Sequence, residues 1–561
     1  MRKQICAKQQ TIPPYISYLS PDFQYQHLPQ QDQYMKYLSL IIVFQLFAGL
    51  LLQAQDSLSQ APPNVILIVV DDMGWNDVSY HGSEIQTPTL DRLAREGVEL
   101  NRFYVHSACT PTRSSLLTGK TALRLGVINP IGKNNVRGLP LSEKIMPQYF
   151  KDKGYATHLV GKWHLGRYQK EYWPYNRGFD HFYGYLTGGI GHYNHVHGGS
   201  LDWQRDGQTI VEEGYSTHLL TDEAIKILQS QTDQPLFLEL CYAAPHMPNE
   251  APHESVVAYN HIKDSNRQLH AAMVSEVDKG IQKLIETLEA TGQLSNSIIW
   301  FMSDNGGLNL EAAPKDVSEP LMQFADVWGT PLPFPFWEFL RDSYVNSAAD
   351  NSPLRGGKGT VYEGGLRVPS FIYAPQLAPA QKVDHRITVN DVLPTLVVAV
   401  GLENFDTIEV DGMSQWAYLQ KQEDALAKPY VTVAKSQQAY FKGDWKLILN
   451  EEGEVQLYQV DTDSTETMDL ASQYPDMVKE LKAELLAFPR GEPIDDPLWK
   501  VFIDPDKFGG EIDREPFAGL EGRVSGPIHS SLYIAGLLIL GVLGLVIWGL
   551  LKLRKVFFKK A

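Results

Sequence analysis

PNVILIVVDD, residues 63–72, is an apolar run that ends in two adjacent carboxylates, Asp71 and Asp72. A continuous apolar run of this length is typical of a strand buried on both faces, as in a parallel sheet. Similar runs occur at residues 156–160 and 235–242 and alternate with segments of helical character. We therefore expect an α/β protein whose large, mixed but mostly parallel sheet is sandwiched by helices. Ligands of such sheets bind beyond the carboxyl ends of the strands, where Asp71 and Asp72 lie.

A second pair of polar residues follows another apolar run. Residues 297–302 read SIIWFM and precede Asp304 and Asn305. Alone, an Asp-Asp or Asp-Asn-Gly sequence is more often a turn or a helix cap than a metal site. Both pairs stand at strand ends, so we expect Asp71, Asp72, Asp304 and Asn305 to form an all-oxygen site for a hard cation, Ca²⁺ or Mg²⁺.

The third feature is a cysteine close to the start of an expected helix. Residues 107–119 read SACTPTRSSLLTG, and Pro111 suits a first helical turn, so Cys109 is predicted to lie just ahead of the helix. A group there faces unpaired backbone N–H donors and the positive end of the helix dipole. Arg113 lies one turn further and can fold back toward Cys109. Taken alone, a cysteine at such a junction is more often a buried structural residue.

Composition limits the classes of protein to consider. The chain has 561 residues, 43% hydrophobic and 20% charged, so it is globular and longer than one ordinary domain. Its formal net charge of −17 argues against a nucleic-acid partner, and an anionic substrate would need a local basic cluster. With only Cys6, Cys109 and Cys241 available, a disulfide framework is excluded. Cys241 lies inside an apolar run and is expected in the core.

Both ends of the chain carry membrane-related segments. We interpret residues 1–34 as a non-native extension and residues 35–54 as a signal peptide, with an uncleaved signal anchor as the alternative. Residues 532–553 are apolar and long enough to span a bilayer, and the basic residues 554–561 follow. The positive-inside rule then predicts a transmembrane helix with a cytoplasmic tail. A buried core helix is the competing interpretation.

These segments predict where the protein resides. The globular part would lie outside the cytoplasm, joined to the membrane by a stalk at residues 504–530. The chain has no Asn-x-Ser/Thr sequon and few cysteines. Both facts favour a bacterial periplasm or cell surface over a eukaryotic secretory lumen.

The sequence around Cys109 resembles the signature of type I sulfatases. In that signature a cysteine, a proline and an arginine at alternate positions precede Leu-Thr-Gly, as Cys109, Pro111 and Arg113 precede residues 117–119. The family oxidises this cysteine to Cα-formylglycine, and the hydrated aldehyde attacks sulfur. A sulfated hydrate can expel sulfate through its second hydroxyl, which a plain thiol cannot do. The resemblance thus implies a formylglycine at position 109, made by a formylglycine-generating maturase.

The resemblance also implies a metal ion. The family binds one divalent ion, usually Ca²⁺, at residues that match Asp71, Asp72, Asp304 and Asn305, beside the modified Cys109. The ion would screen the repulsion between the sulfate oxygens and the nucleophile.

Two basic groups come from a GKWHLG motif that is similar to a motif of the family. By this match, Lys162 would bind a sulfate oxygen. His164 would bond the formylglycine hydroxyl, and Arg113 would hold that hydroxyl from the other side.

Two further motifs of the family follow along the chain. APHMP contains His246, which would contact the ester oxygen and protonate the leaving group. PLRGGKGTVYEGG contains Lys358, which would be the second lysine on the sulfate. Taken singly, each such lysine or histidine is more often a solvated or structural residue, so the inference depends on the joint match.

The resemblance covers about residues 63–488 and implies an alkaline-phosphatase-like fold, with a catalytic domain at 62–415 and a smaller C-terminal α+β part at 428–495. The expected C-terminal elements are strands at 430–434, 438–441, 446–450 and 455–458 and a helix at 477–488. The implied activity is hydrolysis of sulfate esters, in the arylsulfatase B-like group, on sulfated sugars or glycans.

Two other functions remain open. One is a phosphonate monoester or phosphodiester hydrolase of the same superfamily. Another is a non-catalytic, membrane-anchored glycan-binding protein with a lapsed site. A zinc phosphatase is disfavoured, because Asn305 stands where a zinc pair tends to need histidine.

Two further stretches of the sequence lie outside these motifs. GHYNHVHGG carries His192, His195 and His197, which we interpret as a substrate-rim loop in preference to a metal site. Residues 308–352 form an aromatic-rich insert between two motifs. It is either a platform or lid for a sugar ring or a packing or dimer-contact insert.

Overall fold

The computed structural model describes residue 45 and residues 62–495, except 134, 198–199, 231–233, 310–347, 403–408, 426 and 435–436. The expected transmembrane helix, stalk and basic tail, all of the signal peptide but residue 45, and most of the aromatic insert lie outside these residues. Among the helices that are described, none combines the length and apolarity needed to cross a membrane.

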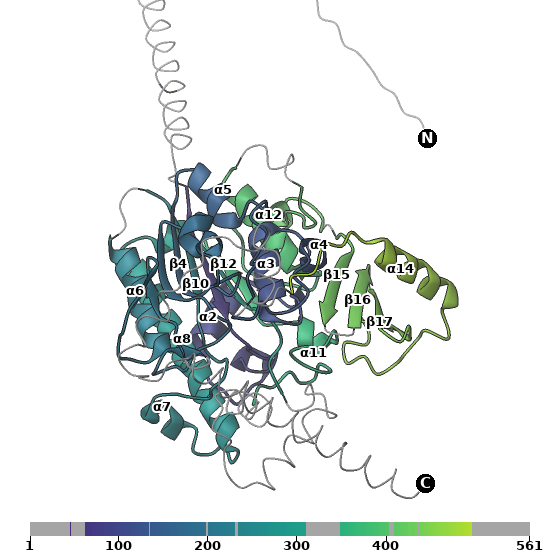
Figure 1. Ribbon diagram of the computed structural model, residues 1–561, viewed down its shortest axis with the longest axis horizontal. Coiled ribbons are helices and arrows are strands. Elements are labelled where there is room, and N and C mark those ends of the chain that lie inside the picture. Colours follow the sequence, from purple (N-terminus) through teal and green to yellow (C-terminus); the bar gives the residue numbers. More distant parts are fainter. Residues whose placement is uncertain are drawn as a thin grey trace, which may run out of the picture. The chain divides into compact units, whose positions relative to one another are not determined.

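A ten-stranded sheet forms the centre of the structure, and Figure 1 labels its strands β4, β10 and β12. The strand order is β13-β2-β12-β11-β1-β10-β4-β5-β8-β9. Its middle strands are parallel: β11 (Ser297–Ser303), β1 (Asn64–Val70), β10 (Leu236–Cys241), β4 (Ala156–Lys162) and β5 (His181–Tyr185). Antiparallel pairs join the outer strands: β12 (Ser370–Tyr373), β2 (Val98–Leu100), β13 (Gln381–Val383), β8 (Gln204–Arg205) and β9 (Gln208–Thr209), although β13 runs parallel to β2. The prediction of a mixed, mostly parallel sheet is confirmed.

Helices cover both faces of this sheet. The odd-numbered apolar residues of β1 pack with α3 (Cys109–Thr118), α5 (Met146–Asp152) and α12 (Val392–Ala399). The even-numbered residues pack with α2 (Pro88–Glu96), α6 (Ser216–Ser230) and α8 (Ser265–Ala290). Each fully buried valine, leucine or isoleucine contributes about 1.5–3 kcal/mol, so a strand apolar on both faces is stable only between two such layers. Cys241 lies in the first of these cores, as predicted.

A second, four-stranded antiparallel sheet follows, which we call the C-terminal sheet. It comprises β15 (Tyr430–Ala434), β16 (Gln437–Lys442), β17 (Trp445–Asn450) and β18 (Val455–Gln459). One face packs on α14 (Pro475–Ala487) through Leu481 and Leu485. The other face packs against Tyr104, Val361 and Leu366 of the preceding part of the chain. The predicted strands and helix are confirmed.

The remaining elements are short. They are strands β3 (Phe103–Tyr104), β6 (Val196–His197), β7 (Ser200–Leu201) and β14 (Ile387–Thr388), helices α4 (Ala122–Leu125), α7 (His253–Ala258), α11 (Glu363–Leu366) and α13 (Trp416–Leu419), and 3₁₀ turns η1 (Ser79–His81), η2 (Lys170–Tyr172), η3 (Pro174–Arg177), η4 (Leu294–Asn296) and η5 (Val389–Asp391).

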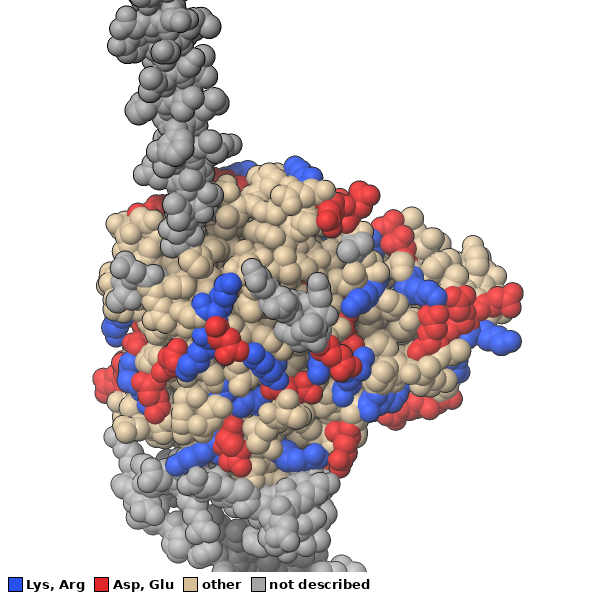
Figure 2. Space-filling view, turned by 90° about the horizontal axis from the view of Figure 1, so that it is seen from above, with Lys and Arg blue, Asp and Glu red and all other residues tan. Residues whose placement is uncertain are grey.

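On the face shown in Figure 2, lysine and arginine are interspersed with aspartate and glutamate. The described part of that face therefore presents mixed charge to solvent. Of the cationic residues that the sequence singles out, Arg113 and Lys162 are buried, and Lys358 is partly buried.

Candidate active site

Four neighbouring strands bring the predicted residues to one edge of the sheet. β11, β1, β10 and β4 are adjacent in the sheet order. Asp304, Asp71 and His246 follow the carboxyl ends of the first three strands, and Lys162 is the last residue of β4. Because the strands are parallel, these residues share one edge, as expected for an α/β ligand site.

Cys109 reaches the same edge from α3. It is the first residue of the helix and is 2% exposed, while Pro111 occupies the third position. Our prediction that Cys109 precedes the helix was wrong, because Ala108 is the extended residue before the first turn. The helix ends at Gly119, whose φ of 67° is the left-handed conformation that favours glycine there. The Cys109 Sγ lies 3.6 Å from Asp71 Oδ1.

The carboxylates and the thiol form one compact group. The ligand atoms of Asp71, Asp72, Cys109 and Asp304 all lie within 4.8 Å of one another, and all four residues are buried. Asn305 Nδ2 donates to Asp72 Oδ1 at 2.7 Å. Its Oδ1 is buried and has no hydrogen-bond partner among the described residues. An orphaned carbonyl oxygen beside three carboxylates is a donor set that fits a hard cation such as Ca²⁺.

Two lysines contact these carboxylates. Lys162 Nζ lies 2.6 Å from Asp71 Oδ2, with both side chains fully buried. Lys358 Nζ lies 2.6 and 2.7 Å from the two oxygens of Asp72. Each of the two lysines therefore pairs with a carboxylate that is also a predicted metal ligand.

Arg113 pairs with the third carboxylate. Its Nε and Nη2 donate to Asp304 Oδ2 at 3.0 and 2.8 Å, and its Nη1 donates to the Lys162 carbonyl at 3.2 Å. The cluster thus pairs three carboxyl groups with three cationic side chains. Buried charges of this kind are tolerated when they are paired and hydrogen-bonded.

The surroundings shift the pKa values of these groups. Burial raises the pKa of Asp71 to about 7, although Lys162 opposes the shift. Burial also acts to raise the pKa of Asp72, but Lys358 and other cations outweigh it and hold that pKa below its usual range. For Cys109, burial raises the pKa of the thiol to about 12, so the unmodified residue stays protonated at neutral pH. A protonated thiol is a poor nucleophile.

Two histidines complete the group. His246 Nδ1 donates to the Met247 carbonyl at 2.7 Å, and this leaves Nε2 facing the site, 3.7 Å from Asp72 Oδ2. His164 is buried, with a φ of 59°, and its Nδ1 has no hydrogen-bond partner among the described residues.

Glycines back both rings. A Cβ on Gly188 would come within 2.6 Å of the His164 ring, and one on Gly189 within 2.8 Å of the His246 ring. The absence of side chains at positions 188 and 189 therefore makes room for the two histidines.

The histidine-rich loop is more deeply buried than the substrate-rim loop that the sequence predicts. His192 is buried and contacts Ser216 Oγ at 2.8 Å and the His246 carbonyl at 2.9 Å. His195 is also buried and stacks on Trp203 at 4.3 Å between ring centroids. Both lie inside the protein rather than on a substrate rim, and His192 fixes the backbone of His246. His197, in β6, is partly buried.

The ends of the aromatic insert meet beside the site. Ala349 N donates to the Leu308 carbonyl at 3.2 Å. Asn351 exchanges two hydrogen bonds with the backbone of Gly307, at 2.8 and 2.9 Å. Residues 310–347 lie outside the described part of the chain, so the two interpretations of the insert stay predictions.

Several buried polar residues near the site were not predicted from the sequence. Glu363, Lys446 and Glu466 form a charged cluster, and His106 bonds Thr432 Oγ1 at 2.9 Å. Glu363 stands in the EGG part of a recognised motif, which was a usable signal. The others lie in segments whose patterns indicate only strands and turns.

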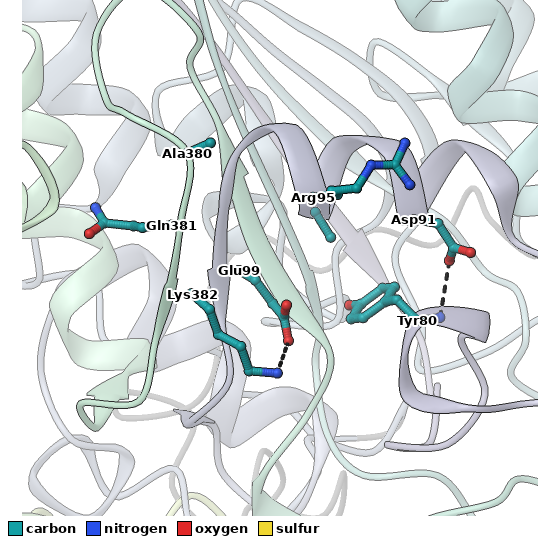
Figure 3. A pocket seen from close by; sticks show the side chains of 8 residues that line it. Tyr80, Asp91, Arg95, Glu99, Ala380, Gln381 and Lys382 are labelled. Carbon is teal, nitrogen blue, oxygen red and sulfur yellow. Dashed lines mark hydrogen bonds and ion pairs between the residues drawn. The ribbon is translucent and has the colours of Figure 1, made fainter.

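A separate surface cavity of about 480 Å³ lies between α2, β2 and β13. Figure 3 shows two contacts among its lining residues: Lys382 contacts Glu99 at 2.7 Å, and Asp91 accepts from Tyr80 N at 3.1 Å. None of the predicted site residues lines it. The chemistry indicated by the sequence therefore belongs to the cluster at the sheet edge.

The fold and the site together indicate a hydrolytic enzyme with an alkaline-phosphatase-like architecture. Comparison with known proteins is more specific. The model of the family named Sulfatase matches residues 63–402. Arylsulfatase J of Mus musculus is 33% identical over 490 residues, which cover 76% of this chain and 75% of that protein.

N-acetylgalactosamine-6-sulfatase of Mus musculus is 29% identical over 377 residues, covering 63% of this chain and 65% of that protein. The crystal structure of Ps i-CgsB in complex with k-i-k-neocarrahexaose has a TM-score of 0.67 and 27% identity, covering 80% of this chain and 98% of that one. The chain belongs to the sulfatase family and is a sulfatase. The predicted family and enzyme class are thereby confirmed.

Proposed function

We propose that this sulfatase hydrolyses sulfate esters of sugars, using a formylglycine made from Cys109 and a bound Ca²⁺. The observation that carries the proposal is the buried cluster in which Cys109 and three carboxylates place their ligand atoms within 4.8 Å. Lys162 and Lys358 contact that cluster at 2.6 Å. A site that combines cation ligands with adjacent amines suits the negatively charged sulfuryl group of a sulfate ester held against a metal ion.

Asp71, Asp72, Asp304 and Asn305, with the modified residue 109, would hold the ion. When bound, the ion supplies charge neutralisation and the formylglycine hydrate supplies the nucleophile. The orphaned Asn305 Oδ1 supports this assignment, because a buried carbonyl oxygen without a hydrogen-bond donor needs another partner.

The protein's own side chains would bind and orient the ester. Lys162 and Lys358 would hold the sulfuryl oxygens, and their charge would count most where it develops in the transition state. His246 would exchange a proton with the ester oxygen through Nε2, because Nδ1 is committed to the Met247 carbonyl. Arg113, anchored on Asp304, would fix the nucleophile helix against the sheet. By the family match, Arg113 and His164 would also hold the formylglycine hydroxyl from its two sides.

The substrate class follows from the relatives. One is named for N-acetylgalactosamine 6-sulfate, and one structure holds a neocarrahexaose. Both compounds are carbohydrates, so we propose a sulfated sugar or glycan for this chain.

A panel of sulfated mono- and disaccharides, tested with protein co-expressed with a formylglycine-generating maturase, examines the proposal. We expect release of inorganic sulfate from at least one sugar. Lys358→Met should abolish it, whereas the surface variant Lys382→Met should not. No release from any member of the panel by maturase-exposed, calcium-loaded protein would count against the substrate class.

The rival activities need separate measurements. Comparing kcat/KM for an aryl sulfate and an aryl phosphodiester separates a sulfatase that acts only on sulfate esters from one that also cleaves phosphodiesters. We expect the sulfate ester to be preferred. A non-catalytic glycan-binding role predicts sugar binding without turnover, and sulfate release excludes it.

We also propose that the protein is tethered to a membrane with its catalytic part outside the cytoplasm. The support is the sequence of residues 35–54 and 532–561. Two assays test this: after carbonate extraction of host membranes the protein should stay in the pellet, and protease added to spheroplasts should cleave it from outside the cytoplasmic membrane. Release by carbonate would contradict the tether.

A further inference from the structure

The C-terminal sheet places a charged group in the protein interior. Lys446, on β17, has a fully buried side chain. Its Nζ lies 3.0 Å from Glu363 Oε1 and 2.7 Å from Glu466 Oε1. Lysine is almost never fully buried unless it is paired, so this contact is specific.

Glu363 is fixed at both its carboxylate and its backbone. Tyr104 OH donates to Glu363 Oε2 at 2.6 Å, and Glu363 N donates to Glu466 Oε2 at 2.7 Å. Glu466 adopts a φ of 53°, which is uncommon for a residue other than glycine, asparagine or aspartate. The two carboxylates and the lysine thus form one buried network, in which Glu363 is the member that belongs to the catalytic part.

Glu363 is the first residue of α11, and α11 contacts the metal-ligand turn. Gly306 N, directly after Asn305, donates to the Gly365 carbonyl at 3.1 Å. The backbones are so close that a Cβ on Gly306 would lie 1.8 Å from the Gly364 carbonyl oxygen. A shift of α11 would therefore displace the turn that carries Asn305.

The loop that carries Lys358 is held between two anchors on the C-terminal part. At its start, Arg355 Nη1 donates to Tyr458 OH at 3.1 Å and to the Glu466 carbonyl at 3.2 Å. At its end, Glu363 contacts Lys446 and Glu466 of the C-terminal part. Lys358 lies between them, and its backbone N donates to the Gly307 carbonyl at 3.1 Å.

The stability of the fold alone does not explain why this buried charged network is present. Burying a lysine and two carboxylates costs desolvation free energy, and well-packed apolar side chains in such places are often as stable or more so. What the charged network adds is geometric specificity, because Lys446 of the C-terminal sheet, Glu466 after it and Tyr104 each fix a different atom of Glu363.

We propose that Lys446 is a positioning residue for the sulfate-binding site: through Glu363 it fixes α11 and hence the place of Lys358 and of the Asp304–Asn305 turn. This inference rests on the proposed role of Lys358 in holding sulfate. The C-terminal sheet is then part of the construction of the active site rather than an appended domain.

The test compares Lys446→Met and the milder Tyr104→Phe with wild type in the full, calcium-loaded protein. Lys446→Met removes the charge that holds Glu363, and Tyr104→Phe removes one hydrogen bond to the same carboxylate. Lys442→Met is the matched control, because that lysine lies on the neighbouring strand and pairs only at the surface with Glu480 and Glu484.

Two readouts separate positioning from mere support of the fold. Inhibition by inorganic sulfate and KM for a sulfate ester report on the place of Lys358. Both constants should rise about tenfold or more in Lys446→Met, since small displacements at a binding site have large effects. Hydrogen exchange of peptides covering residues 303–309 and 353–366 reports on the loops themselves and should accelerate about tenfold or more, as expected for local opening. Lys442→Met should change neither.

The inference is overturned if both variants lower the thermal midpoint while the exchange rates and the sulfate inhibition constant stay within about twofold of wild type. If Lys446→Met does not fold, Tyr104→Phe decides by the same criteria with a smaller change in the same direction. If wild type binds no sulfate, the proposed role of Lys358 fails, and the hydrogen-exchange comparison still decides whether Lys446 holds the two loops.

Discussion

Replacing Lys358 by methionine should change the affinities for calcium and sulfate in opposite directions. Each carboxylate of the cluster is paired with a cation of the protein itself, and Asp72 is paired with Lys358. Calcium must compete with the Lys358 amine for Asp72, whereas sulfate needs that amine. Lys358→Met removes the competitor of the metal ion and, at the same time, a group that holds the anion. We expect tighter calcium binding and weaker sulfate binding.

The size of the effect follows from the contact. Lys358 Nζ lies 2.6 Å from Asp72 Oδ1, and the two side chains are 16% and 4% exposed. At an effective dielectric constant of about 20, unit charges at that distance attract by about 6 kcal/mol. Desolvation of the two groups cancels most of this attraction. A net free energy of about 1–3 kcal/mol remains, which corresponds to about 5–150-fold in a dissociation constant.

Isothermal titration calorimetry measures both affinities. EDTA-stripped protein is titrated with calcium chloride in sulfate-free buffer, and the calcium-loaded protein is then titrated with sodium sulfate. Lys382→Met is the control, because this lysine is half exposed and pairs with Glu99 away from the cluster. Calcium affinity that falls in Lys358→Met would refute the competition and with it the reasoning from charge balance.

Three further outcomes are expected. Arg113→Met should lower the free energy of unfolding of the metal-free protein by about 3–5 kcal/mol, because it leaves Asp304 buried without its cation; a loss below about 1 kcal/mol in urea denaturation would contradict the pairing. Calcium should raise the thermal midpoint of wild type and EDTA should reverse this, by mass action; a midpoint that ignores calcium would count against the metal site. Burial acts to raise the pKa of Asp77, but His270 and Arg267 outweigh it and hold the pKa below its usual value. Ionised Asp77 therefore stabilises the fold fully above about pH 4, and this stabilisation declines as the pH falls toward the lowered pKa. Asp77→Asn should flatten the loss of stability between about pH 4 and pH 2, and equal slopes in acid denaturation would refute this.

Strand ends could be predicted from sequence because they depend on local patterns. An apolar run such as residues 64–70 is stable only as a strand covered on both faces, and the residues after it must lie at the sheet edge. Asp71 and Asp304 were therefore placed correctly without knowledge of the tertiary structure. The motif residues Lys162 and His246 follow similar runs, and the structure brings them to the same edge.

Contacts across the chain could not be predicted in the same way. Glu363 and Lys446 are 83 residues apart in sequence, and nothing in the pattern of β17 distinguishes a buried lysine from a solvated one. The start of α3 was misplaced because Pro111 is tolerated at several positions of a first turn. His192 was read as a rim residue because its partners, Ser216 and the His246 carbonyl, come from other elements.

Conversion of Cys109 to formylglycine is the central claim, and mass spectrometry of the peptide that contains it is the most direct test. In active protein isolated after exposure to the maturase, the peptide should be about 18 mass units lighter than its unmodified sequence predicts, because an aldehyde oxygen replaces the thiol and a hydrogen. An unmodified thiol at position 109 in protein that nevertheless cleaves sulfate esters would contradict the account.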